Sequence, residues 1–203
     1  MIKMPFCGRA SEWSKAAFLS MFPAIGIHCA GLGTPFWMKS STISNSVNIT
    51  IGLWKMVNCS GSLTSPCIGS ALPNSYKTDL LIITRAFECG VIIPMALTFA
   101  LSFFYTTSPG ARTQKVAAWI MILSFFSMAL VIGGTVTWIL NLPSSHYVYW
   151  SFGLTLFGGS LSMLVAVLMI QDIRMFDYEG IRLRKEAKRE KREARKNKRK
   201  EQY

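Results

Sequence analysis

Four long apolar stretches constrain the fold of this chain more than any other feature. They cover residues 16–37, 80–105, 116–140 and 148–170. A helix needs about 20 apolar residues to cross the hydrocarbon core of a bilayer. None of the four stretches carries the polar stripe that a surface helix of a soluble protein shows every three to four residues. The sequence therefore predicts an all-α membrane protein with four transmembrane helices.

The charged residues are few and unevenly placed. They make up 16% of the 203 residues, and 13 of the 22 Lys and Arg fall within 174–200, whereas soluble domains carry about a quarter charged residues. We therefore divide the chain into a four-span domain, 1–173, and a basic tail, 174–203. The tail mixes Glu with Lys and Arg at helical spacing, which favours a solvated single helix. A disordered basic anchor is the alternative, because the tail has no apolar face to bury.

The net charge of +12 raises nucleic acid as a partner. However, the clustered charges have no aromatic residues among them to stack on bases, and the run directly follows an apolar span. Polybasic segments in that position meet anionic lipid headgroups. We therefore expect the tail to contact anionic lipid or a cytoplasmic protein, and we expect no nucleic-acid partner.

The short segments at one set of span ends keep clusters of Lys and Arg, and positive flanks stay in the cytoplasm. This predicts a plasma-membrane protein with cytoplasmic termini, an outer loop at 38–79 and a short outer segment at 141–147. A cleaved signal peptide is the alternative interpretation of the first stretch. Cleavage would leave three spans and would put two basic segments on opposite sides, so the pattern favours four. The basic flanks are Lys3, Arg9, Lys15, Arg112, Lys115 and the tail.

Small residues are grouped inside the spans. Because lipid provides no hydrophobic driving force between helices, spans pack by close approach through small residues. We expect a left-handed four-helix bundle, with kinks at Pro23 and Pro94. The grouped residues are Gly26, Ala30, Gly31, Gly33, Gly133, Gly134, Gly153, Gly158, Gly159 and Ser160.

Five cysteines separate by location. Cys59 and Cys67 lie in the outer loop, where two thiols normally form a disulfide; zinc is the weaker alternative, because no His or second cysteine pair is near. Cys29 and Cys89 lie within spans and are expected to pack as small apolar side chains. Cys7, just before a span, is a candidate for palmitoylation, with an unmodified thiol as the alternative. We expect no metal and no cofactor.

The outer loop also carries two glycosylation sequons, at Asn48 and Asn58. Asn58 is the poorer acceptor because it adjoins Cys59. Residues 44–54 are rich in Val, Ile and Thr, which predicts strands and a small extracellular sheet. Trp37 and Trp54 would anchor that sheet, although Trp37 has the alternative interpretation of an interfacial belt residue.

Two charges in the second span stand out. Arg85 and Glu88 are three residues apart, so they can form an ion pair near the outer surface. The alternative assigns one of them to an ion or partner site. No catalytic arrangement accompanies them, because neither His28 nor His146 has a nucleophile or carboxylate partner at a suggestive spacing. We expect a protein that is not an enzyme.

Several motifs resemble the claudin, peripheral-myelin and epithelial-membrane protein superfamily, which includes clarins and calcium-channel gamma subunits. The resemblance covers residues 1 to about 175. Its spacing departs from the family, with four residues between Trp54 and Cys59 where claudins and gamma subunits keep two, and the second outer loop is shorter than in a typical claudin. The motif residues are Gly33 to Trp37, Gly52, Leu53, Trp54, Cys59, Cys67, Arg85 to Phe87 and Tyr149 to Gly153.

The resemblance implies a four- or five-stranded antiparallel extracellular sheet over a left-handed bundle, with the Cys59–Cys67 bridge joining neighbouring strands. It also implies adhesion or barrier formation at cell junctions, through self-association or claudin-like partners in cis and trans. An auxiliary, gamma-like subunit of an ion channel or receptor is the second function that the resemblance implies.

Overall fold

Four helical segments are long and apolar enough to cross a membrane. The computed structural model describes the backbone of residues 11–40, 47–60 and 67–200, and the side chains of 11–40, 49–59 and 67–175. The predicted spans are confirmed, with end shifts of at most five residues. The four segments are α1 (Glu12–Gly33), α2 with α3 (Asp79–Thr107), α4 (Gln114–Leu140) and the first part of α5 (Trp150–Met175).

The second span consists of two helices, α2 (Asp79–Gly90) and α3 (Ile92–Thr107), which are separated at Val91. Pro94 has no N–H for the carbonyl of Gly90, and its ring crowds that carbonyl. The break therefore lies where a proline kink is expected. In contrast, α1 runs through Pro23 as one continuous helix.

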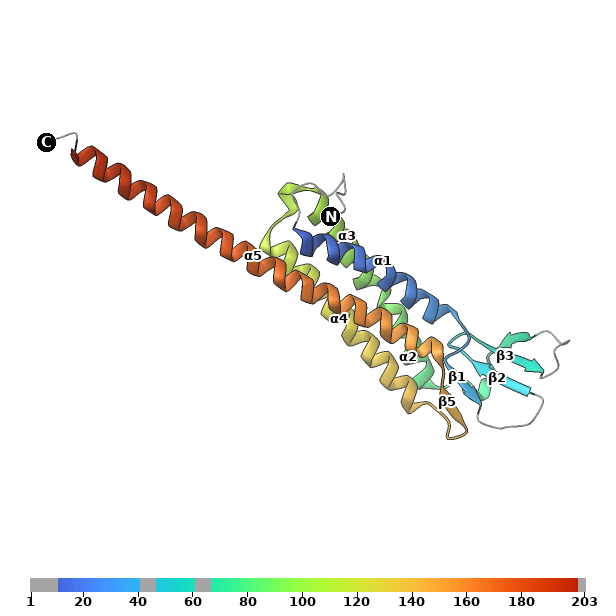
Figure 1. Ribbon diagram of the computed structural model, residues 1–203. Helices are drawn as coiled ribbons and strands as arrows, with labels where there is room; N and C mark the ends of the chain where they lie inside the picture. Colours follow the sequence, from blue (N-terminus) through green and yellow to red (C-terminus); the bar gives the residue numbers. More distant parts are fainter. Residues whose placement is uncertain (1–10, 41–46, 61–66, 201–203) are drawn as a thin grey trace.

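The spans form a bundle in which α1 packs most extensively on α5, and the sheet lies at one end (Figure 1). Glycines allow this close approach. A Cβ at Gly31 would lie 2.9 Å from the Ser151 carbonyl oxygen, and one at Gly158 would lie 2.9 Å from the Ala24 carbonyl oxygen. Gly26, Gly33 and Gly153 have open space around them instead, so only part of the predicted small-residue set mediates packing.

Replacing Gly158 with alanine is expected to destabilise the bundle by about 1–3 kcal/mol, because the added methyl group meets the backbone of α1. The matched control is Gly153→Ala in the same helix, where the methyl group meets open space. That variant is expected to be neutral or stabilising by up to about 1 kcal/mol, through helix propensity. Thermal unfolding in detergent compares the two variants. Equal unfolding temperatures would contradict the close contact of α1 with α5.

A five-stranded antiparallel sheet covers the end of the bundle. The predicted strand 44–54 contains β2, and the five strands agree with the upper number that the resemblance implied. The strand β5 was not predicted, because three residues give too short a pattern to detect. The strands are β1 (Met38–Ser40), β2 (Val47–Ile51), β3 (Lys55–Ser60), β4 (Ile68–Ala71) and β5 (His146–Val148), in the order β4-β3-β2-β1-β5.

Two short 3-10 helices, η1 (Asn74–Tyr76) and η2 (Pro109–Ala111), complete the described structure. The helix α5 continues past the membrane span to Lys200. It leaves the bundle on the side away from the sheet (Figure 1). The structure therefore agrees with the interpretation of the basic tail as a single helix.

Candidate functional site at the junction of sheet and bundle

A disulfide joins Cys59 and Cys67, as predicted. Cys59 lies in β3, and Cys67 immediately precedes β4. Because Asn58 pairs with Ile68 in the ladder between these strands, the two cysteines stand opposite each other at the next position. Both thiols are used in this bridge, which leaves the zinc interpretation of the pair without ligands. Within the described residues, no three metal-ligating side chains gather.

The structure describes the other predicted modification sites to different extents. Asn58 is exposed on β3, while the backbone of Asn48 lies in β2 opposite Cys59. Cys7 lies outside the described residues. Cys29 is exposed on the bundle and Cys89 is partly buried. Glycosylation and palmitoylation stay predictions.

Trp37 lies just beyond α1 and is completely buried. Its indole Nε1 donates a hydrogen bond of 2.8 Å to the Gly31 carbonyl oxygen. The ring packs edge-on against Trp138 of α4, with the ring centroids 5.1 Å apart. Its backbone N–H donates to Ile51 of β2. Trp37 therefore links the bundle to the sheet, and the interfacial-belt interpretation is wrong.

Residues 52–54, here called the docking turn, connect β2 to β3 and rest on the end of α1. A Cβ on Gly52 would lie 2.5 Å from the Cα of Pro35, so only glycine fits without a shift of the backbone. Leu53 is fully buried. Trp54 stays partly exposed, and its Nε1 donates to the Leu32 carbonyl oxygen at 3.0 Å. The docking turn thereby fixes the sheet to the first span.

Arg85 of α2 holds the docking turn from the other side. Its Nε and Nη2 both donate to the Leu53 carbonyl oxygen, at 2.9 and 2.5 Å. The guanidinium carbon lies 4.9 Å from the centroid of the Trp54 ring, within cation–π range. Arg85 and Glu88 therefore face different surroundings, and the predicted ion pair between them is wrong. A spacing of three residues makes such a pair available on a helix, but the nearby carbonyl group and aromatic ring bind the arginine instead.

Arg85→Lys is expected to lower stability by about 1–2 kcal/mol, because an ammonium group replaces neither the paired donors nor the planar stacking. Lys77→Arg at an exposed position is the control, and we expect it to leave stability unchanged. Thermal unfolding followed by tryptophan fluorescence reports both. If Arg85→Lys unfolds at the wild-type temperature, Arg85 does not hold the docking turn.

A titratable contact lies at the edge of the sheet. The hydroxyl of Tyr76 is 3.4 Å from Nε2 of His146 in β5, and the two rings pack edge-on. Burial lowers the pKa of His146 below its ordinary value. The neutral form of this histidine is therefore favoured in the folded sheet.

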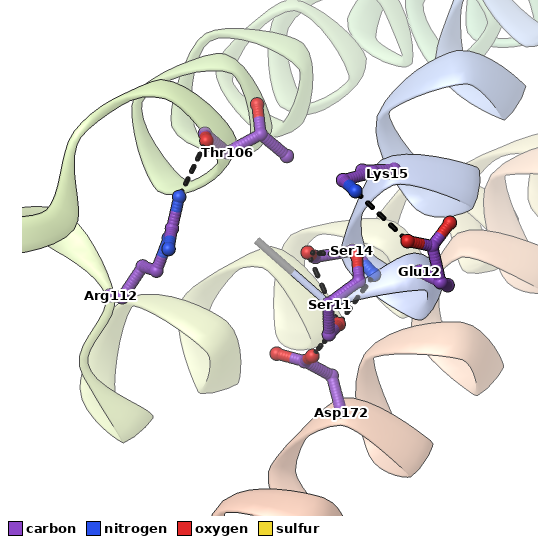
Figure 2. A network of polar contacts seen from close by, with 7 residues as sticks. All are labelled: Ser11, Glu12, Ser14, Lys15, Thr106, Arg112 and Asp172. Carbon is purple, nitrogen blue, oxygen red and sulfur yellow. Dashed lines mark hydrogen bonds and ion pairs between the residues drawn. The ribbon is translucent and has the colours of Figure 1, made fainter. Parts of the chain in front are cut away.

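A second polar cluster joins three helices at the end of the bundle away from the sheet (Figure 1). Figure 2 shows its Ser11, Asp172, Thr106 and Arg112. Asp172 of α5 is buried and accepts hydrogen bonds from the hydroxyl of Ser11, the N-cap of α1, and from the hydroxyl of Tyr105 of α3. Arg112 donates to the carbonyl oxygens of Tyr105 and Thr106 at the end of α3. Sequence reasoning missed this cluster, although a lone Asp at the end of an apolar stretch was a signal.

Tyr105→Phe is expected to destabilise the bundle by about 1.5–3 kcal/mol, since it removes one donor from a buried carboxylate. Tyr147→Phe alters an exposed ring, and we expect a change within about 0.5 kcal/mol. Chemical or thermal unfolding of both variants in the same detergent gives the comparison. An effect of Tyr105→Phe as small as that of Tyr147→Phe would remove the proposed role of the Asp172 contact.

These features define a class: a multi-pass membrane protein whose four apolar helices carry a small, disulfide-linked antiparallel sheet at one end. The residues singled out by their motifs, Trp37, the docking turn and Arg85, come together where the sheet meets the bundle. Neither a family model nor a curated protein matches the chain.

Proposed function

We propose that this chain is a member of the claudin and peripheral-myelin superfamily and acts, without enzymatic activity, in cell–cell adhesion or barrier formation. In this proposal the protein lies in the plasma membrane with cytoplasmic termini and with the sheet outside the cell. The observation that carries the proposal is the convergence of Trp37, residues 52–54 and Arg85 on one junction. Such a junction holds the sheet rigidly on the bundle, as a surface that meets other molecules requires.

The outer strand β4 supports a role in contacts between proteins. All four of its residues are exposed, and Ile68 has 68% of its surface accessible. As the last strand in the order β4-β3-β2-β1-β5, it presents an edge that no other described strand pairs with. Edges of this kind pair readily with another chain unless a charge or a covering segment protects them. Self-association in cis, contacts in trans, or both would use this edge.

Expression in non-adherent cells tests the proposal. The protein is expected to concentrate at the borders between touching cells, and freeze-fracture is expected to reveal strands. Ile68→Lys places a charge on the edge and should reduce border enrichment at equal surface expression. Asn74→Lys, exposed in η1 and outside the sheet, is the matched control. A uniform distribution of the wild-type protein in contacting cells would contradict an adhesive role.

The second candidate, an auxiliary subunit of a channel or receptor, draws support from β5. Within the short segment between α4 and α5, His146–Val148 form β5 and pair with β1 at the edge of the sheet. This leaves little free loop for contacts across cells and makes the sides of the spans the larger surface. Purification in gentle detergent decides between the two candidates. A stoichiometric channel partner favours the auxiliary role, and repeated recovery of self-oligomers alone excludes it.

A further inference from the structure

An ionisable pair lies inside the bundle, apart from the junction. His28 of α1 and Glu88 of α2 are both completely buried, and the His28 Nε2 is 3.7 Å from the Glu88 Oε2. The two residues are 60 positions apart in the chain. Ionisable side chains inside a span are costly, and they are rarely kept without a role.

All four spans meet at this pair. A Cβ on Gly134 of α4 would lie 2.5 Å from the Glu88 Oε1, and a Cβ on Gly158 of α5 would lie 2.9 Å from the backbone nitrogen of His28. Both glycines therefore leave room for the two ionisable side chains and for nothing larger. The niche is built by α1, α2, α4 and α5 together.

Few hydrogen bonds from the surroundings compensate the charges of His28 and Glu88. The His28 Nε2 is 3.1 Å from the Glu88 backbone carbonyl oxygen, which can only accept, so Nε2 carries a hydrogen. Within the described side chains, His28 Nδ1 and both carboxyl oxygens of Glu88 have no hydrogen-bond partner. Unbalanced charge in such surroundings costs several kcal/mol.

The neighbouring elements supply no compensating ion. Arg85, one turn away on α2, is bound to the Leu53 carbonyl oxygen and stacks on Trp54. Cys89 is partly buried beside Glu88. The helix α4 faces the pair with Gly134, and α5 faces it with Gly158 and with the uncharged backbone of Thr155. Among the described residues, the charge state of the niche is therefore set by His28 and Glu88 themselves.

We propose that His28 and Glu88 form a proton-binding site that holds one titratable proton between α1 and α2. With one proton the pair is neutral overall, either as imidazolium with carboxylate or as imidazole with carboxylic acid. Without it the niche holds one negative charge, and with two protons it holds one positive charge. The bound proton thus keeps the meeting point of the four spans neutral, a property separate from the proposed adhesive function.

Spectroscopy of the full chain in lipid nanodiscs tests the proton count. Infrared spectra report a carboxylic-acid carbonyl stretch that Glu88→Gln would abolish, and nitrogen NMR of histidine-labelled wild-type protein reports whether His28 is an imidazolium. One of the two signatures at neutral pH is expected, and either one supports the site. Finding neither signature, or both at full intensity, overturns it. Asp172→Asn is the infrared control, because Asp172 accepts two hydroxyl hydrogen bonds and lies outside the niche.

A double-variant comparison tests the coupling. His28→Gln is expected to lower the unfolding temperature of the wild-type chain, and to have less than half that effect in a Glu88→Gln background, where no carboxyl group remains to be balanced. Thr98→Val is the control. It removes a buried hydroxyl of α3 that has no hydrogen-bond partner among the described residues, so its effect on the unfolding temperature should be equal in both backgrounds. Equal effects of His28→Gln in the two backgrounds overturn the proposal. If the variants do not fold, the infrared and NMR spectra of the wild-type protein decide together.

Discussion

Trp37→Ala is expected to be among the most damaging single substitutions in the junction, lowering stability by about 3–5 kcal/mol. The indole is completely buried, so its removal leaves a cavity between the sheet and the bundle. The substitution also leaves the Gly31 carbonyl oxygen without the indole donor and removes the edge-on contact with Trp138. Thermal unfolding in detergent measures the loss, and the accessibility of β1 and β2 to hydrogen exchange should rise with it.

Trp54→Ala provides the matched control, because Trp54 is also a tryptophan at the junction but remains 45% exposed. We expect a clearly smaller loss of stability from it. Trp37→Phe separates two causes, since it keeps most of the ring volume and removes the donor. If Trp37→Ala and Trp54→Ala are equally mild, the packing of Trp37 between the sheet and the bundle is incorrect.

Removing the disulfide with Cys59→Ser and Cys67→Ser together is the second substitution with a large expected effect. The bridge closes a short loop with a sequence separation of 8 residues, for which the chain-entropy relation gives about 2.5 kcal/mol. Because β3 and β4 form the outer end of the sheet, the loss should concentrate there. Hydrogen exchange is expected to rise in β4 while the four spans stay protected.

Cys29→Ala is the control for the cysteine variants, because Cys29 is exposed and outside the disulfide. We expect it to leave both the unfolding temperature and the exchange pattern unchanged. Non-reducing and reducing electrophoresis of the wild-type protein should differ in mobility. Free Cys59 and Cys67 thiols in intact cells would contradict the bridge.

The spans and the disulfide could be predicted because their signals are local. About 20 apolar residues in a row require an apolar solvent whatever else the chain does, so 80–105 and 116–140 were placed within two residues of the observed helices. Cys59 and Cys67 are close in sequence and suit a tight bridge between strands. The β-branched side chains within residues 44–54 predicted a strand.

What sequence reasoning missed depends on contacts between distant elements. Glu88 lies beside His28 only in the folded bundle, whereas a single helix suggested Arg85 as its partner. The sequence fitted Trp37 equally well to a membrane interface and to a packing role, because only the folded structure brings the sheet over its side chain. The strand β5 forms only because β1 offers it an edge, and its three residues carry no period of their own. The contacts of Asp172 could not be predicted, because its partners Tyr105 and Ser11 come from two other helices.

Side-specific labelling tests the central claim most directly, namely that four helices cross a membrane with the sheet on one side and the turn between α3 and α4 on the other. Single cysteines at Ser75, Ser144 and Gly110, all exposed, would be introduced with Cys7, Cys29 and Cys89 replaced. A membrane-impermeant reagent on intact cells is expected to label positions 75 and 144 but to reach position 110 only after permeabilisation. Labelling of positions 75 and 110 from the same side would contradict the account.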